Sequence, residues 1–229
     1  MTARVVVLAA PSGGGKTTIA REVLRRAPAR FGYSVSATTR APRAAEQDGV
    51  AYHFLTRPGF EARIARGEFL EWAEYAGERY GTLRQEVERV LGSNRHVVLD
   101  IEVQGARQVR EKYPHPASLS LFVLPPSPAT LIERLRGRRT ESEQQMRERL
   151  AIAVREVRAA QDDAPVGRMF DDVLVNDDLD KAVERVITLA EQPASPARPP
   201  EARAALLAAF ARELAIEAER FVSLAKRSR

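Results

Sequence analysis

A glycine-rich run between a predicted strand and a predicted helix is the feature that most constrains this chain. The run is Ala10-Pro11-Ser12-Gly13-Gly14-Gly15-Lys16-Thr17-Thr18. Residues 4–9, which are apolar after Arg4, predict a short buried strand, and residues 17–27 predict a helix that ends before Pro28. Glycines let successive backbone N–H groups curl around an anion, and the start of a helix adds positive potential. The run therefore predicts a phosphate-binding loop.

The polar residues of this loop fit a nucleotide phosphate and its metal ion. The pattern G-x-x-x-x-G-K-[ST] places Lys16 at the β- and γ-phosphates and the Thr17 hydroxyl on Mg²⁺. Ala10 stands where the pattern has its first Gly, which bears on the geometry of the loop and leaves the chemistry of Lys16 and Thr17 intact. We expect the nucleotide contacts to come from Ser12, Gly13, Gly14, Gly15, Lys16, Thr17 and Thr18.

Strand and helix patterns alternate along most of the chain. Residues 96–100, 119–124 and 170–175 read as further buried strands, with helices at 103–112, 128–136, 141–162 and 178–192. This alternation predicts an α/β fold whose parallel sheet is covered on both faces. Residues 34–95 break the rhythm and predict an inserted lobe, with strands at 33–39, 52–55 and 69–75 and helices at 57–66 and 83–91.

Composition excludes several classes of site. The chain has no Cys, which excludes disulfides and Cys-ligated zinc, and its three His leave little room for a His-rich metal site. The net charge of +5 permits a nucleic-acid partner but fits an anionic small substrate equally well. No apolar run approaches the roughly 18 residues of a membrane span, and the N-terminus shows no export signal. We therefore expect a cytoplasmic protein.

Four further motifs carry a family resemblance. They are Ser34-Val35-Ser36-Ala37-Thr38-Thr39-Arg40-Ala41-Pro42-Arg43, Gly49-Val50-Ala51-Tyr52-His53-Phe54, Phe69-Leu70-Glu71-Trp72-Ala73 and Arg79-Tyr80-Gly81-Thr82. In order and spacing they resemble the nucleotide-monophosphate-binding segments of guanylate kinases, and the resemblance runs from about residue 3 to residue 192. It implies a P-loop NTPase three-layer fold, transfer of the γ-phosphoryl group of ATP to GMP and to dGMP with Mg²⁺, and no nucleic-acid partner.

The acceptor chemistry also follows from the residue types. Guanine presents N1–H and N2–H₂ donors on one edge, and a single carboxylate accepts from both, so Glu71 is the natural candidate. The resemblance assigns Glu71 this role and adds Ser36 and Thr82 to the base contacts. Arg40 and Arg43 suit a bidentate grip on the 5′-phosphate, with Tyr52 and Tyr80 as O–H donors.

The catalytic residues are assigned by resemblance. Asp100 ends an apolar strand, where such an acid faces the Mg²⁺ hydration shell or orients the acceptor's phosphate grip. Glu102 stands where the family often has Asp. Arg134, Arg138 and Arg149 match lid positions that neutralise the transferring phosphoryl group, and Asn176 matches a segment near the adenine. The implied kinase core is 1–33 and 96–192, with the lid at about 127–160 and the GMP-binding lobe at 34–95.

Two rival functions stay open. One is a guanylate-kinase-like module that binds protein partners without catalysis; it would not need Lys16, Thr17 or the lid arginines, and the chain has all of them. The other is a related kinase for a different phosphorylated acceptor, such as a phosphorylated ribose. Glu71 with Ser36 and Thr82 favours guanine over that alternative.

The C-terminal residues lie beyond the resemblance. Residues 193–200 read as a Pro-rich linker, and residues 201–229 as a helical extension. Leu207, Phe210, Leu214, Phe221 and Leu224 form one apolar stripe on that helix. Three hypotheses remain: a frayed, solvated tail; a helix docked on the kinase body or on a second subunit, which would allow a homo-oligomer; and, less favoured, an anionic membrane surface.

Overall fold

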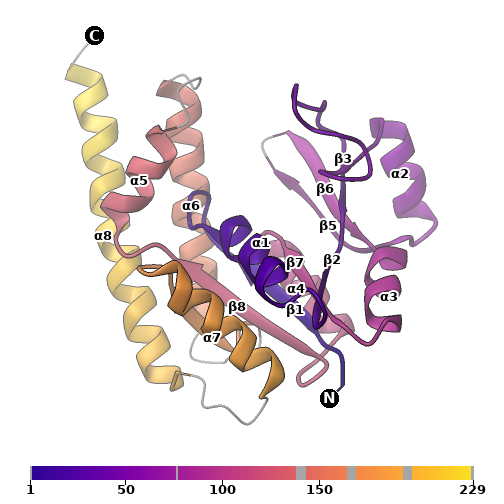
Figure 1. Cartoon of the computed structure of the whole chain (residues 1–229). Helices are drawn as coiled ribbons and strands as arrows, with labels where there is room; N and C mark the ends of the chain where they lie inside the picture. The colour runs from indigo at the N-terminus through magenta and orange to yellow at the C-terminus, as the bar shows by residue number, and fades with distance from the viewer. Residues whose placement is uncertain (1, 76, 138–142, 164–168, 193–197, 228–229) are drawn as a thin grey trace.

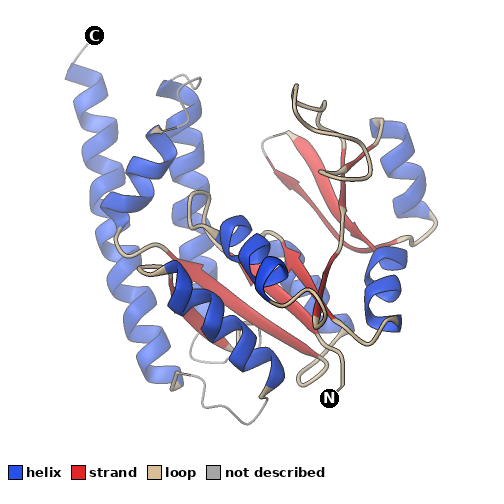
Figure 2. Ribbon diagram, viewed as in Figure 1, coloured by secondary structure: helices blue, strands red, loops and turns tan. Residues whose placement is uncertain are grey.

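A five-stranded parallel sheet forms the centre of the protein (Figure 2). The computed structural model describes residues 2–75, 77–137, 143–163, 169–192 and 198–227. The strand order is β2 (Phe31–Tyr33), β7 (His96–Asp100), β1 (Val5–Ala9), β8 (Ser118–Leu124) and β9 (Asp172–Val175), and all neighbours run parallel. The glycine-rich run follows β1, the central strand, at its carboxyl end.

Helices cover both faces of this sheet, which confirms the predicted three-layer arrangement. Val6 and Leu8 of β1 belong to the core under α1 (Lys16–Arg26) and α7 (Leu179–Glu191). Val5 and Val7 face the opposite core. That core is built with α4 (Val103–Lys112), α5 (Pro128–Arg136) and α6 (Glu143–Asp163). The alternation along β1 is what a fully buried strand requires.

The strands between residues 34 and 95 form a separate sheet beside the main one (Figure 1). Its order is β4 (His53–Phe54), β3 (Ser36–Thr38), β6 (Glu78–Leu83) and β5 (Phe69–Tyr75), accompanied by α2 (Arg57–Ala65) and α3 (Arg84–Gly92). It has a small core of its own, in which the rings of Phe60 and Phe69 stack with centroids 4.3 Å apart.

One strand prediction in this region was wrong, and one strand was not predicted. The strand expected at 33–39 is two strands, because the chain leaves the main sheet after β2 and enters the second sheet at β3. The strand β6 was not predicted, since Gly81 interrupts its pattern. A Cβ at Gly81 would lie 2.8 Å from the Phe69 ring and 2.9 Å from the Glu71 carbonyl oxygen. Close packing against β5 therefore explains a glycine inside a strand.

The C-terminal helix α8 (Pro200–Arg227) packs along α6 and α5 (Figure 1). Leu207, Phe210 and Leu214 are buried in the main core. The buried Arg203 side chain donates to the carbonyl oxygen of Phe170 over 2.9 Å and also to that of Asp171. The structure thus shows a helix docked on the body of its own chain. None of the helices in the described ranges, α8 included, is long and apolar enough to span a bilayer.

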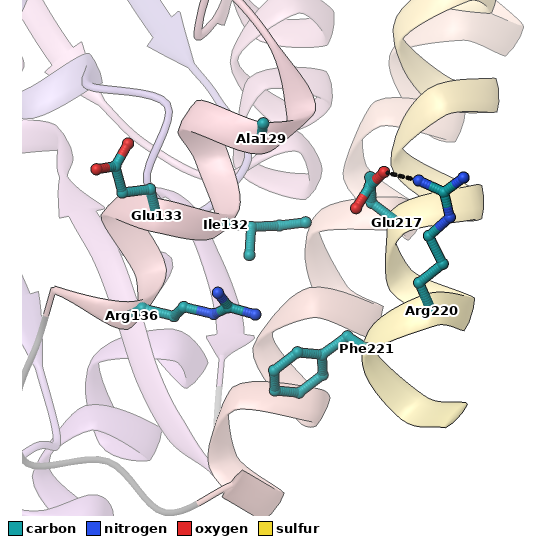
Figure 3. A pocket seen from close by; sticks show the side chains of 7 residues that line it. All are labelled: Ala129, Ile132, Glu133, Arg136, Glu217, Arg220 and Phe221. Carbon is teal, nitrogen blue, oxygen red and sulfur yellow. Dashed lines mark hydrogen bonds and ion pairs between the residues drawn. The ribbon is translucent and has the colours of Figure 1, made fainter. Parts of the chain in front are cut away.

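A pocket of about 280 Å³ lies between α5 and α8 (Figure 3). Ile132 and Phe221 line it from the two helices, and charged side chains surround them. The Arg136 guanidinium lies 5.4 Å from the centroid of the Phe221 ring. This cation–π contact ties the end of α5 to α8.

Candidate active site

The backbone conformation of the glycine-rich loop favours glycine at two positions. Gly13 and Gly15 have φ of +87° and +97°, in the left-handed region that glycine adopts without strain. Asn176, which follows β9, donates from Nδ2 to the Gly14 carbonyl oxygen over 3.3 Å. A Cβ at Gly15 would overlap with Asn176 Nδ2. The structure therefore places Asn176 directly against the loop, where it holds the backbone in shape.

The loop has room for the Ala10 methyl group because residue 14 is glycine. Ala10 is fully buried, and a Cβ at Gly14 would lie 2.7 Å from the Ala10 methyl carbon. The methyl group thus occupies space that a side chain at position 14 would need. The turn is still closed, since the Gly14 N–H donates to the Pro11 carbonyl oxygen over 2.8 Å.

Lys16, the first residue of α1, forms an ion pair with Glu102, which directly precedes α4. Its Nζ donates to Glu102 Oε1 over 2.9 Å. Burial opposes the charge on Lys16, but the charges of Glu102, Glu156 and Asp100 outweigh it and raise the pKa of Lys16. Burial likewise opposes ionisation of Glu102, yet Lys16 and a hydrogen bond with Glu156 lower the pKa of Glu102. The pair is therefore charged.

Glu156 of α6 is a site residue that the sequence analysis missed. It is buried, and burial together with the Glu102 charge raises its pKa well above the usual range. Glu156 thus holds a proton while Glu102 holds the charge. A signal was present in the sequence, because a carboxyl between the core residues Ala153 and Val157 on an apolar helix face needs a partner.

The Asp100 carboxylate accepts hydrogen bonds from two hydroxyl groups beside Lys16. Thr17 Oγ1 donates to Asp100 Oδ2 over 2.8 Å, and the Tyr33 hydroxyl donates to Asp100 Oδ1 over 3.0 Å. A hydroxyl and a carboxylate at the phosphate loop are ligands that Mg²⁺ accepts when phosphate oxygens and water complete the shell. No group of three or more His, Cys, Asp or Glu in the described ranges could hold a metal ion, so the fit rests on this pair. Tyr33 was not predicted.

The residues assigned to the base form one row across the second sheet. Ser36 of β3 and Glu71 of β5 both lie opposite Thr82 of β6, so the three side chains share a face. Thr82 Oγ1 donates to Glu71 Oε1 over 2.6 Å. The Glu71 side chain is buried; burial raises its pKa to about 7, although hydrogen bonds with Thr82 act in the opposite direction.

A cationic and aromatic cluster lies near this row. The Arg40 guanidinium is 5.5 Å from the centroid of the Tyr52 ring, which is 6.0 Å from that of Tyr80. Arg40 Nη2 lies 2.9 Å from each carboxylate oxygen of Glu46, a partner the sequence analysis missed. Arg43 is exposed, and its backbone N–H donates to Glu46 over 2.8 Å. The structure therefore brings Arg40, Tyr52 and Tyr80 together, and the exposed Arg43 contributes a backbone contact to Glu46.

The lid arginines are placed unequally. Arg134 of α5 has Nη1 3.5 Å from the Gly13 carbonyl oxygen. Arg149 of α6 lies near Tyr75, since its charge is among the causes that act to lower the pKa of that hydroxyl. Burial nevertheless raises the pKa of Tyr75, and a hydrogen bond with Ser12 opposes that rise, so Tyr75 connects the second sheet to the loop. Arg138 and residues 193–197 of the predicted linker lie outside the described residues.

Comparison with known proteins accounts for nearly the whole chain up to the extension. The family model for guanylate kinase matches residues 2–192. A guanylate kinase of Synechocystis sp. is 47% identical over 186 residues, which are 81% of this chain and 92% of that protein. A guanylate kinase of Rubrobacter xylanophilus is 48% identical over the same shares of the two chains.

A solved structure agrees with the sequence matches. The guanylate kinase of Anaplasma phagocytophilum superposes with a TM-score of 0.65 at 28% identity, covering 85% of this chain and 88% of that one. This likeness also confirms the predicted P-loop NTPase fold. With a matching loop, a separate acceptor sheet and these relatives, the chain belongs to the guanylate kinase family.

Proposed function

We propose that this nucleoside monophosphate kinase transfers the γ-phosphoryl group of ATP to GMP, giving ADP and GDP for guanine nucleotide synthesis and recycling. The observation that carries the proposal is the row of Ser36, Thr82 and Glu71 on one face of the second sheet. Residues 34–95 are the proposed acceptor lobe, and about 127–160 the lid. Because ATP and GMP are cytoplasmic metabolites, we assign the reaction to the cytoplasm.

The base is selected by donor and acceptor matching. The Glu71 carboxylate accepts from guanine N1–H and N2–H₂, whereas adenine presents an acceptor at N1 and would leave a buried carboxylate unpaired. Thr82 and Ser36 complete the contacts. No residue of the proposed set is assigned to the ribose, so we expect dGMP to be accepted as well.

Phosphoryl transfer depends mainly on positioning and on neutralising charge. Arg40 with Tyr52 and Tyr80 holds the acceptor phosphate, and Glu46 holds Arg40 in place until it arrives. Arg43 is proposed to join this grip when GMP is bound. We assign Lys16 and the arginines 134, 138 and 149 to neutralising the charge of the transferring group.

The metal site of this proposal is built from Thr17 and Asp100. Their oxygens lie 2.8 Å apart beside the phosphate loop. Mg²⁺ bound there would neutralise charge on the β- and γ-phosphates of ATP. Glu102 reaches Lys16 in this structure, so we assign Glu102 to the lysine and to the acceptor side of the site, and Asp100 to the metal.

A coupled assay of ADP release against a panel of monophosphates tests the proposal. GMP and dGMP should be turned over in the presence of Mg²⁺, whereas AMP, CMP, UMP and ribose 5-phosphate should not. Lys16→Met should bind GMP normally and lose roughly 10²-fold or more in turnover, because its contact strengthens in the transition state. No turnover of any acceptor by the folded wild-type protein would favour a binding module, and turnover of ribose 5-phosphate would favour the other rival.

A further inference from the structure

The helix α4 contacts β5 through one of its faces. Gly105, Gln108 and Lys112 are spaced three and four residues apart, so they lie on the same side of the helix. They meet consecutive residues of β5, which are Glu71, Trp72 and Leu70 respectively. Val103, Ala106 and Val109 of the same helix pack into the main core.

Gly105 leaves the space that Glu71 occupies. A Cβ at position 105 would lie 2.9 Å from Glu71 Cδ and still closer to Oε2, nearer than carbon atoms approach in real structures. A glycine inside a helix destabilises the helix relative to alanine, so its presence there needs a reason. Here the reason is the close approach of the carboxylate.

Gln108 and Lys112 fix the backbone on either side of Glu71. Gln108 Nε2 donates to the Trp72 carbonyl oxygen over 2.8 Å, and its Oε1 accepts from the Trp72 N–H over 3.3 Å. The Gln108 side chain thus pairs with β5 much as a neighbouring strand would. The Lys112 ammonium donates to the Leu70 carbonyl oxygen, and its charge is one of the causes that lower the pKa of Glu71.

These contacts coincide with a break in the strand ladder. Phe69 pairs with Leu83 and Glu71 with Thr82, so Leu70 is an extra residue opposed by nothing on β6. Such a bulge redirects the side chain that follows it. The buried Leu70 side chain inserts into the main core, next to residues of α4. Glu71 is therefore aimed by a bulge that α4 grips from outside the second sheet.

From this geometry we propose that the Gly105–Gln108–Lys112 face of α4 positions the Glu71 carboxylate and thereby sets the preference of the enzyme for guanine. The three are positioning residues, because they act through Glu71. The inference rests on the proposed function, in which Glu71 reads the base. It places part of the base selectivity on a helix of the kinase core, outside the acceptor lobe.

The test compares GMP with IMP, whose base keeps N1–H and lacks the 2-amino group. Gly105→Ala and Gln108→Met should each raise the KM for GMP roughly 5- to 100-fold and leave the KM for ATP unchanged. The ratio of kcat/KM for GMP to that for IMP should fall by at least about 5-fold, since a displaced carboxylate no longer meets both donors. The pH below which GMP use declines should also move down, because a carboxylate pushed from its buried place ionises more easily.

Two controls match these variants. Gly92→Ala changes the last residue of α3, where an added Cβ meets nothing within 4 Å. Arg107→Met introduces methionine on the exposed face of α4. Both should keep the GMP-to-IMP ratio and the pH profile of the wild type. If Gly105→Ala fails to fold, Gln108→Met carries the test alone.

The outcomes distinguish a failure of this inference from a failure of the proposed function. Glu71→Gln is measured in the same assay. If Glu71→Gln lowers GMP use and the two α4 variants keep the wild-type ratio and pH profile, the positioning role is wrong and the proposed function stands. If Glu71→Gln itself leaves GMP use unchanged, the assignment of Glu71 to guanine is wrong, and the inference fails with it. Loss of thermal stability without a change in ratio or pH profile also overturns the positioning role.

Discussion

At the scale of the residue, Glu71 shows a conflict between stability and recognition. A carboxylate that must accept two hydrogen bonds from a base is most selective when water is excluded, but burial makes its ionised form costly. Burial raises the pKa of Glu71 to about 7, so near neutral pH the ligand-free protein holds this carboxyl group where its ionised form is disfavoured despite the hydrogen bonds with Thr82. The donors of guanine would supply what the free protein lacks.

This conflict predicts a pH-dependent stability. The folded-state pKa of about 7 exceeds the ordinary 4.5, so the contribution of Glu71 is complete below about pH 4.5 and is lost as the pH rises through 7. The loss amounts to about 3 kcal/mol. The urea concentration at the midpoint of unfolding should therefore favour Glu71→Gln over the wild type more at pH 8 than at pH 5. Glu88→Gln, on the exposed face of α3, is the control, and a wild-type-like pH dependence in Glu71→Gln would contradict the prediction.

At the scale of the element, α8 is held by a few buried side chains on one face. Leu214 is fully buried against the main core, whereas Ile216, two residues later, is 46% exposed. An isolated helix gains little stability in water, so α8 depends on the burial of Leu207, Phe210 and Leu214 in the main core beside α5 and α6. The stripe, and not the helix propensity of its alanines, therefore determines whether α8 is formed.

A pair of substitutions on α8 tests this. Leu214→Ala should lower the free energy of unfolding by about 2–5 kcal/mol, because it leaves a cavity in a packed interface. Ile216→Ala removes a similar side chain from the exposed face and should change stability by less than about 0.5 kcal/mol. Thermal and urea unfolding measure both. Equal, small effects would mean that the helix docks too weakly to matter.

At the scale of the whole molecule, the extension and the site are separate in sequence but share one core. Every proposed substrate, metal and lid residue precedes Asp177, and the side chains that α8 buries join the cluster that also contains residues of α4, α5 and α6. Removing residues 194–229 should therefore lower the melting temperature, while Mg·ATP-dependent phosphorylation of GMP survives in the folded fraction.

The same deletion has two informative alternatives. Loss of activity in a folded truncation would show that α8 acts on the site, for example through the Arg136–Phe221 contact at the end of α5. An unchanged melting temperature would contradict the docked arrangement. Light scattering completes the experiment, because the surface uncovered on α5 and α6 is apolar and should promote self-association.

The parts of this molecule that depend on local pattern could be predicted from the sequence. The alternation of buried strands and helices predicted the main sheet, and the spacing around Lys16 predicted the loop. Strand β6 was not predicted, because Gly81 looks like a break until the Phe69 ring beside it is known. Tyr33, Glu46 and Glu156 were not predicted either, because their roles arise from partners far away in the chain or across a loop.

The apolar stripe of α8 illustrates the same limit. The residues Leu207, Phe210 and Leu214 predicted a helix with one apolar face, but not the surface that covers it. Several coverings satisfy the same hydrophobic pattern, and only the arrangement of α5 and α6 distinguishes among them. Arg203 is a second example, since a buried guanidinium among alanines becomes intelligible only with the carbonyl oxygens of Phe170 and Asp171 in place.

The position of α8 in the chain has a consequence for how the protein is made. It lies C-terminal to every other described element, so the ribosome synthesises it after all of them. Throughout that time the apolar surface it will cover on α5 and α6 faces the solvent. Nascent chains with such surfaces associate with one another and recruit chaperones. The docking of this helix therefore covers a surface that would otherwise promote aggregation, and a ribosome that stalls before residue 200 leaves a chain with that surface still exposed.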